Sequence, residues 1–90
     1  MTVFVEQAVK EIATNPSPNG TVELCIGCVE SDTEPVEDTV MIAGGTVTDT
    51  ISTTATNGIV ATVPETSVEA IIEHPNVETV ETNTLKLLSN

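Results

Sequence analysis

The sequence has almost no aromatic and very few basic side chains. Phe4 is the only aromatic among 90 residues, and two lysines face fourteen acidic residues, for a net charge of -12. Without Trp or Tyr, the core has to be built from small aliphatic side chains, so we expect a single small domain of marginal stability. A charge of this sign and size repels the phosphates of nucleic acids and anionic lipids, which excludes both as favourable partners.

Long apolar runs are also missing. No run approaches the ~20 residues that a bilayer-spanning helix needs, and residues 1–15 lack the basic and continuous apolar regions of a secretory signal. We therefore expect a cytoplasmic protein. The many acidic and threonine residues with few lysines indicate adaptation to concentrated salt, where charges are screened over about 3 Å at 1 M.

The N-terminal region has a helical pattern followed by a linker. Apolar residues recur at helical spacing over about residues 3–13, which predicts a short amphipathic helix. The stretch TNPSPNG, residues 14–20, contains two prolines and a glycine and cannot continue that helix. We therefore expect residues 1–19 to form a helix and linker, and residues 20–90 to form the compact domain with its C-terminal tail.

The rest of the chain alternates between strand and helix periodicity. The predicted strands lie near 21–28, 46–53, 58–63 and 77–83, and the predicted helices near 33–43 and 65–73. The order β-α-β-β-α-β is that of the split βαβ motif. The sequence thus predicts an α+β, ferredoxin-like sandwich: a four-stranded antiparallel sheet with two helices on one face, plus the short N-terminal helix.

Residues 44–81 carry a family likeness. The paired glycines at 44–45, the small residues that follow and above all HPNVETVE at 74–81 resemble the subtilase propeptide and proteinase-inhibitor family. The likeness is good over residues 44–83 and extends to 21–43 only by pattern. The eight-residue stretch also has a structural explanation, because Pro75 stops a helix and Val77 and Val80 can face a core.

The resemblance implies an inhibitor of a subtilisin-like serine protease, monomeric when free, or an assistant in folding such an enzyme. Members of the family present the open face of the sheet to two surface helices of the protease, while the C-terminal tail lies extended in the substrate cleft. Here the expected open face consists of Thr46, Thr48, Thr50, Ser52, Val60, Thr62, Thr79 and Glu81.

The family's acid-x-acid pair on the last strand caps the N-termini of those protease helices. Glu81 and Asn83 match its positions, with an uncharged residue at the second. In the tail TLKLLSN, Leu85 and Leu88 have the spacing of the two main specificity pockets, and Lys86 with Ser89 is the competing register. The expected protease-binding residues are therefore Glu81, Asn83, Leu85, Lys86, Leu87, Leu88, Ser89 and Asn90.

The pair Cys25-Ile-Gly-Cys28 supports an alternative function. Small metal-binding domains of ferredoxin-like fold carry C-x-x-C near this location, where the thiolates could hold Cu(I) or share Zn(II) with His74. If both cysteines lie in one strand, however, their odd spacing places them on opposite faces. We therefore expect no metal and no other cofactor.

A third hypothesis is an interaction module without a protease target, in which the N-terminal helix docks a partner. Deleting residues 1–19 would then abolish function, whereas the inhibitor hypothesis predicts that inhibition survives. His74 is interpreted as an ordinary residue at a helix C-terminus. No Ser-His-Asp or Cys-His-Asp set is evident, so we expect no enzymatic activity.

Overall fold

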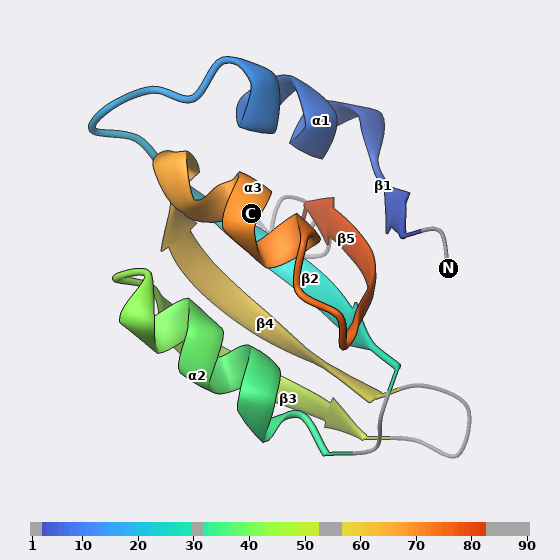
Figure 1. Cartoon of the computed structure of the whole chain (residues 1–90). Coiled ribbons are helices and arrows are strands. Elements are labelled where there is room, and N and C mark those ends of the chain that lie inside the picture. The colour runs from blue at the N-terminus through green and yellow to red at the C-terminus, as the bar shows by residue number, and fades with distance from the viewer. Residues whose placement is uncertain (1–2, 30–31, 53–56, 83–90) are drawn as a thin grey trace, which may run out of the picture.

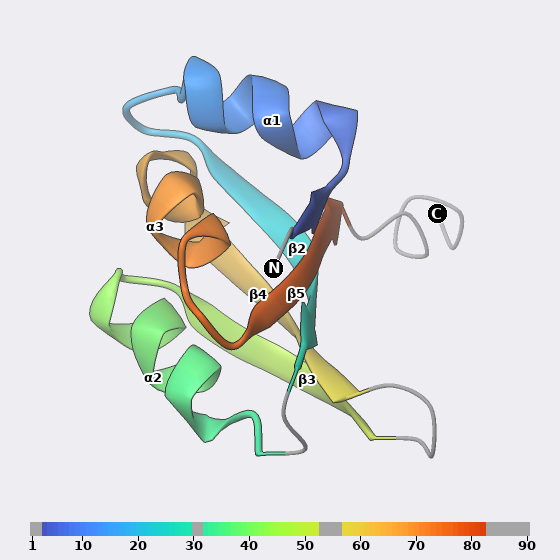
Figure 2. The ribbon, with the colours of Figure 1, turned by 45° about the vertical axis from the view of Figure 1, so that its right-hand side comes forward.

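A computed structural model describes residues 3–29, 32–52 and 57–82 of the chain. Its five strands form one sheet in the order β1-β5-β2-β4-β3, and its three α-helices pack on one face of that sheet (Figures 1 and 2). The elements are β1 (Phe4–Val5), α1 (Gln7–Thr14), β2 (Thr21–Cys28), α2 (Glu34–Ile42), β3 (Thr46–Ser52), β4 (Asn57–Pro64), the 3-10 turn η1 (Glu65–Ser67), α3 (Val68–Ile72) and β5 (Val77–Thr82).

The sheet differs from the predicted one at its β5 edge. The α+β class is confirmed, and β5, β2, β4 and β3 pair antiparallel in that order. Instead of a four-stranded antiparallel sheet, however, the protein has a five-stranded mixed sheet, because β1 pairs with β5 in parallel. Both residues of β1 lie within the range predicted for the N-terminal helix.

The N-terminal helix was predicted to start too early. Residues 3–5 have the period of a strand, since Val3 and Val5 pack against the core while Phe4 is exposed. The helix α1 starts only at Gln7. The backbone N–H of the preceding residue, Glu6, still donates to the carbonyl of Val80 in β5 at 3.0 Å. Residues 3–5 therefore belong to the sheet rather than to the helix.

The core lies between the sheet and the helices and consists of aliphatic side chains and the thiol of Cys28. Val9 of α1 is fully buried, and Ile12 and Ala13 pack against the same cluster, so the N-terminal segment contributes to the core of residues 20–82. None of the helices in the described ranges has the length and apolar character needed to span a bilayer. The buried hydrophobic residues are Val9, Leu24, Ile26, Cys28, Val36, Val40, Ile59, Ala61, Val63, Val68, Ile71, Val77 and Val80.

The turn after α2 brings β3 against β4. Gly44 has φ 92°, a left-handed conformation that ends a helix readily only at glycine, and the N–H of Gly45 donates to the carbonyl of Val40 at 2.8 Å. A Cβ on Gly45 would lie 2.8 Å from the carbonyl oxygen of Thr62, so the backbones approach too closely for a side chain. Gly44 thus allows α2 to end, and Gly45 allows the backbone at the start of β3 to approach β4 closely.

Candidate functional site

The sheet face opposite the helices is uncovered in the described part of the chain (Figure 2). Residues opposite each other on adjacent strands direct their side chains to the same face. The pairing aligns one residue of each strand in a single row on this open face, which we call the cross-sheet row. In strand order β1, β5, β2, β4 and β3, it consists of Phe4, Thr79, Gly27, Gly58 and Ile51.

The two glycines at the centre of the row create a hollow. Its volume is about 200 Å³, and Gly27 and Gly58 form its floor while Thr79 and Ile51 stand on either side. Three strand spacings of about 4.8 Å, or about 14 Å, separate the backbones of Thr79 and Ile51, and the two side chains take up part of that width. The residues lining the hollow are Cys25, Ile26, Gly27, Ile51, Gly58, Thr79 and Glu81.

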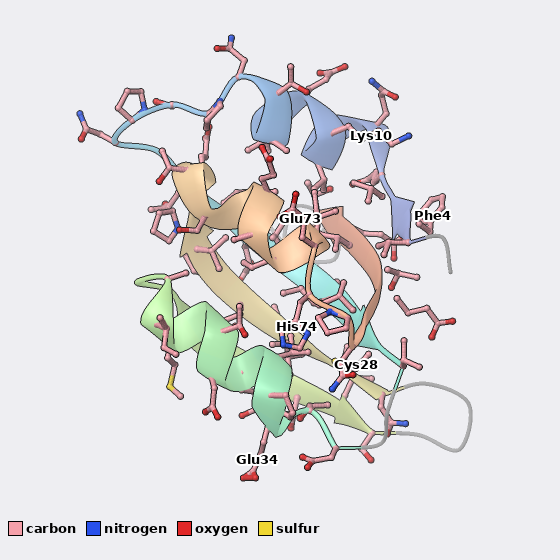
Figure 3. All side chains as sticks on the ribbon, in the orientation of Figure 1. Phe4, Lys10, Cys28, Glu34, Glu73 and His74 are labelled. Carbon is pink, nitrogen blue, oxygen red and sulfur yellow. The ribbon has the colours of Figure 1, made fainter. Side chains whose placement is uncertain are left out.

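Phe4 marks the end of the row at the β1 edge. Its side chain is 58% exposed, although it is the only aromatic residue of the chain, and Figure 3 shows it projecting from β1 at the margin of the molecule. Sequence reasoning missed this residue because it assigned Phe4 to a helix. The alternation of Val3, Phe4 and Val5 was the signal that could have revealed it.

The charged side chains that strand pairing places on the open face are acidic. Glu23 lies two residues before Cys25 on β2, and Glu81 of β5 pairs with Cys25. Asp49 of β3 pairs with Val60. Burial, and then the negative charges of Glu81 and Glu23, raise the pKa of the Cys25 thiol. The thiol is therefore protonated at neutral pH and is a poor nucleophile.

Only one of the expected protease-binding residues falls within the described part. Glu81 is exposed on β5, on the open face, at the rim of the hollow. Asn83, Leu85, Lys86, Leu87, Leu88, Ser89 and Asn90 lie outside the described residues.

The expected open face was correct for β4 and β5 and partly wrong for β3. The pairing between β3 and β4 shifts between Val47 and Asp49, at a β-bulge that inserts Thr48. Beyond this bulge, Thr50 pairs with the buried Ile59, and Ser52 pairs with Asn57, so both are on the helix side of the sheet. The open-face positions of β3 after the bulge are instead Asp49 and Ile51.

The two cysteines lie on opposite faces of β2, as their spacing predicted. Cys25 lines the hollow, whereas Cys28 is 5% exposed and belongs to the core. Burial, and then the negative charge of Glu37, raise the pKa of Cys28. Because the two thiols lie on opposite faces, the C-x-x-C pair cannot chelate one ion. The Nδ1 atom of His74, the third candidate ligand, accepts a hydrogen bond from the backbone N–H of Asn76 at 3.0 Å.

Comparison with known protein families gives a match that covers most of the chain. The family described as "Putative peptidase inhibitor domain" matches residues 4–83, a range that includes every helix and strand named above. The curated proteins and the solved structures gave no significant match.

Proposed function

The chain belongs to this family of peptidase inhibitors, and from that premise we propose that its target is a subtilisin-like serine protease. The family role is binding to a peptidase, which is consistent with a protein that is not an enzyme. The finer assignment is supported by the resemblance of residues 74–81 to the subtilase propeptide family. The structural observation that carries it is the uncovered sheet face with its glycine-floored hollow.

In this proposal the open face docks on surface helices of the protease. The hollow of about 200 Å³ can receive a side chain from the end of a helix, and the lack of a side chain at Gly58 keeps the sheet surface low at that point. Glu81 stands at the rim, where its carboxylate can cap a helix N-terminus, and Asn83 provides a second, uncharged cap. The acidic character of the face favours the positive end of a helix dipole.

The C-terminal tail provides the second contact. Residues 85–90 enter the substrate cleft in extended form, with Leu85 and Leu88 in the two main pockets or Lys86 and Ser89 in the competing register. A tail that ends near the catalytic serine fills the subsites as a product does and offers little to cleave. The same docking would let the free monomer assist the folding of a separately encoded protease by stabilising the helices it contacts.

Titration against a subtilisin-like protease tests the proposal, with peptide hydrolysis followed at low and at molar salt. The Glu81→Ala variant should weaken inhibition by roughly 0.5–2 kcal/mol, the range of a lost helix cap, and by less at high salt. Glu69→Ala is the matched control, because Glu69 is also exposed but lies on α3 in the helix layer. If no such protease is inhibited at micromolar concentration in any salt, the proposed target is wrong.

The tail contact is tested separately by Leu88→Asp. This change should weaken inhibition by more than about 2 kcal/mol, because a carboxylate would be desolvated in an apolar pocket without a partner. The Thr66→Asp variant adds the same charge at an exposed residue of η1, outside the expected protease-binding residues, and should have a much smaller effect. Equal inhibition by the Leu88→Asp variant and the unaltered chain would show that the tail does not occupy the pockets.

A further inference from the structure

Glu6 connects the N-terminal segment to the end of the last strand. It lies between β1 and α1, and its side-chain Oε1 accepts two hydrogen bonds from Thr82. The backbone N–H of Thr82 donates at 2.9 Å and its hydroxyl donates at 2.7 Å. Residues that are 76 positions apart in the sequence are thus joined at one carboxylate oxygen, an arrangement that we call the Glu6–Thr82 clamp.

The clamp is stronger than a pair of neutral hydrogen bonds. Bonds to an ionised acceptor are short and roughly twice as strong as bonds between neutral groups. The two bonds from Thr82, the backbone one first, lower the pKa of Glu6, so its carboxylate is charged at neutral pH. Thr82 also pairs with Leu24 of β2, so it is held from two neighbouring elements.

Strand ends are where local opening begins, and Thr82 is the last residue of β5. The chain passes directly from Thr82 into residues 83–90. If Thr82 moved freely, binding would have to order both the tail and the strand end that directs it. Because the Glu6–Thr82 clamp already fixes Thr82 in the free protein, binding loses less conformational entropy in ordering the strand end.

We propose that Glu6 is a positioning residue for inhibition: by fixing Thr82, it sets the direction in which the C-terminal tail leaves the sheet. This inference rests on the proposed function, in which that tail enters the protease cleft. It also makes β1 and α1 part of the inhibitory unit. Deletion of residues 1–19 should therefore weaken inhibition, in contrast to the expectation from the sequence.

The role of Glu6 is separable from the packing of α1. Val9 anchors α1 in the core, and Ile12 and Ala13 pack beside it, so loss of the Glu6 side chain leaves these apolar contacts in place. Glu11 provides a matched control, since it is an acidic residue of the same segment whose side chain contacts Gln7 within α1. Glu6→Gln retains an acceptor oxygen and serves as the conservative variant.

Amide hydrogen exchange of the full chain, measured by NMR, tests the clamp without any protease. In Glu6→Ala, the Thr82 amide should exchange about tenfold faster or more, while the amide of Ile59 in the core strand β4 keeps its rate. Glu6→Gln should restore most of the protection, and Glu11→Ala should change neither amide. An unchanged Thr82 rate in Glu6→Ala, or equal acceleration at Thr82 and Ile59, would overturn the proposal.

A double-mutant cycle in the full chain tests the link to the tail. Glu6→Ala should raise the inhibition constant about tenfold in the unaltered chain and less than about twofold in the Leu88→Asp background, where the tail is already disengaged. Equal effects in both backgrounds would overturn positioning through the tail. If the unaltered chain inhibits no protease, the proposed function fails, whereas the exchange rate of Thr82 still decides whether Glu6 fixes the strand end.

Discussion

At the scale of single residues, Gly27 and Gly58 decide the shape of the open face. They face each other across β2 and β4, and neither has room for a side chain without a shift of its neighbours. A Cβ on Gly58 would lie 2.5 Å from the carbonyl oxygen of Ile26, which is backbone, whereas a Cβ on Gly27 would meet the Oγ1 of Thr79, a side chain that can rotate. The two glycines are therefore not equivalent.

Gly58→Ala should destabilise the fold by roughly 1–3 kcal/mol, because the crowded backbone of β2 has to move. Gly27→Ala should cost less, because rotation of Thr79 relieves the contact. Urea denaturation of both variants measures the difference. A greater loss of stability in Gly27→Ala would contradict this assignment of the contacts.

The lowered pKa of Glu6 also predicts a pH dependence of stability. Because the folded-state pKa lies below the unfolded one, the contribution of the clamp is fully present above the ordinary glutamate pKa of about 4.3 and is lost as the pH falls through the folded value. The unaltered chain should therefore be more stable than Glu6→Gln at neutral pH, and the difference should shrink below about pH 4. Denaturation of both proteins across this range checks the prediction, and a difference independent of pH would contradict it.

At the scale of elements, β1 adds an edge strand with two different faces. Val5 packs against the core, whereas Phe4 is exposed at the end of the cross-sheet row. An exposed aromatic at the border of a binding face is the kind of residue that often dominates the energy of an interface. The strand that was absent from the predicted sheet thus extends the candidate binding face.

The two residues of β1 should respond in opposite ways to substitution. Phe4→Ala should change the free energy of unfolding by no more than about 0.5 kcal/mol but weaken peptidase inhibition about fivefold or more. Val5→Ala should destabilise the fold by about 1 kcal/mol, since it removes core contacts. Denaturation and inhibition assays of both variants separate the two roles. Unaltered inhibition by Phe4→Ala would exclude the β1 edge from the interface.

At the scale of the whole molecule, charge repulsion acts on a core of small side chains. The net charge is -12, and the buried residues include no aromatic in the described part of the chain. Repulsion between like charges opposes the compact state, and salt screens it. Stability should therefore depend on ionic strength more than it does in a neutral domain of this size.

The denaturation midpoint should rise steeply as chloride salt increases from low concentration to about 1 M. A variant with Asp38→Asn, Glu73→Gln and Glu78→Gln provides the control, because all three side chains are exposed and their loss lowers the negative charge by three. Its midpoint should rise less over the same range. A flat profile for the unaltered chain would show that repulsion does not limit its stability.

The sequence by itself determined the order of the main elements, the acidic charge and the opposite orientation of Cys25 and Cys28 in β2. These properties follow from local periodicity: β2 begins and ends as predicted, and α2 differs from its predicted range by one residue at each end. The Pro75 stop was also readable, although the predicted helix 65–73 is divided into η1 and the shorter α3.

Only the tertiary structure decided the partner of β1, the bulge of β3 at Thr48 and the clamp between Glu6 and Thr82. Each depends on which distant backbone lies alongside, and a periodic pattern carries no information about that choice. Two residues at the N-terminus read equally well as a helix start or a strand. They form β1 because β5 has an unpaired edge on which Thr79 and Val80 are in register with them, and that edge exists only after the chain has folded.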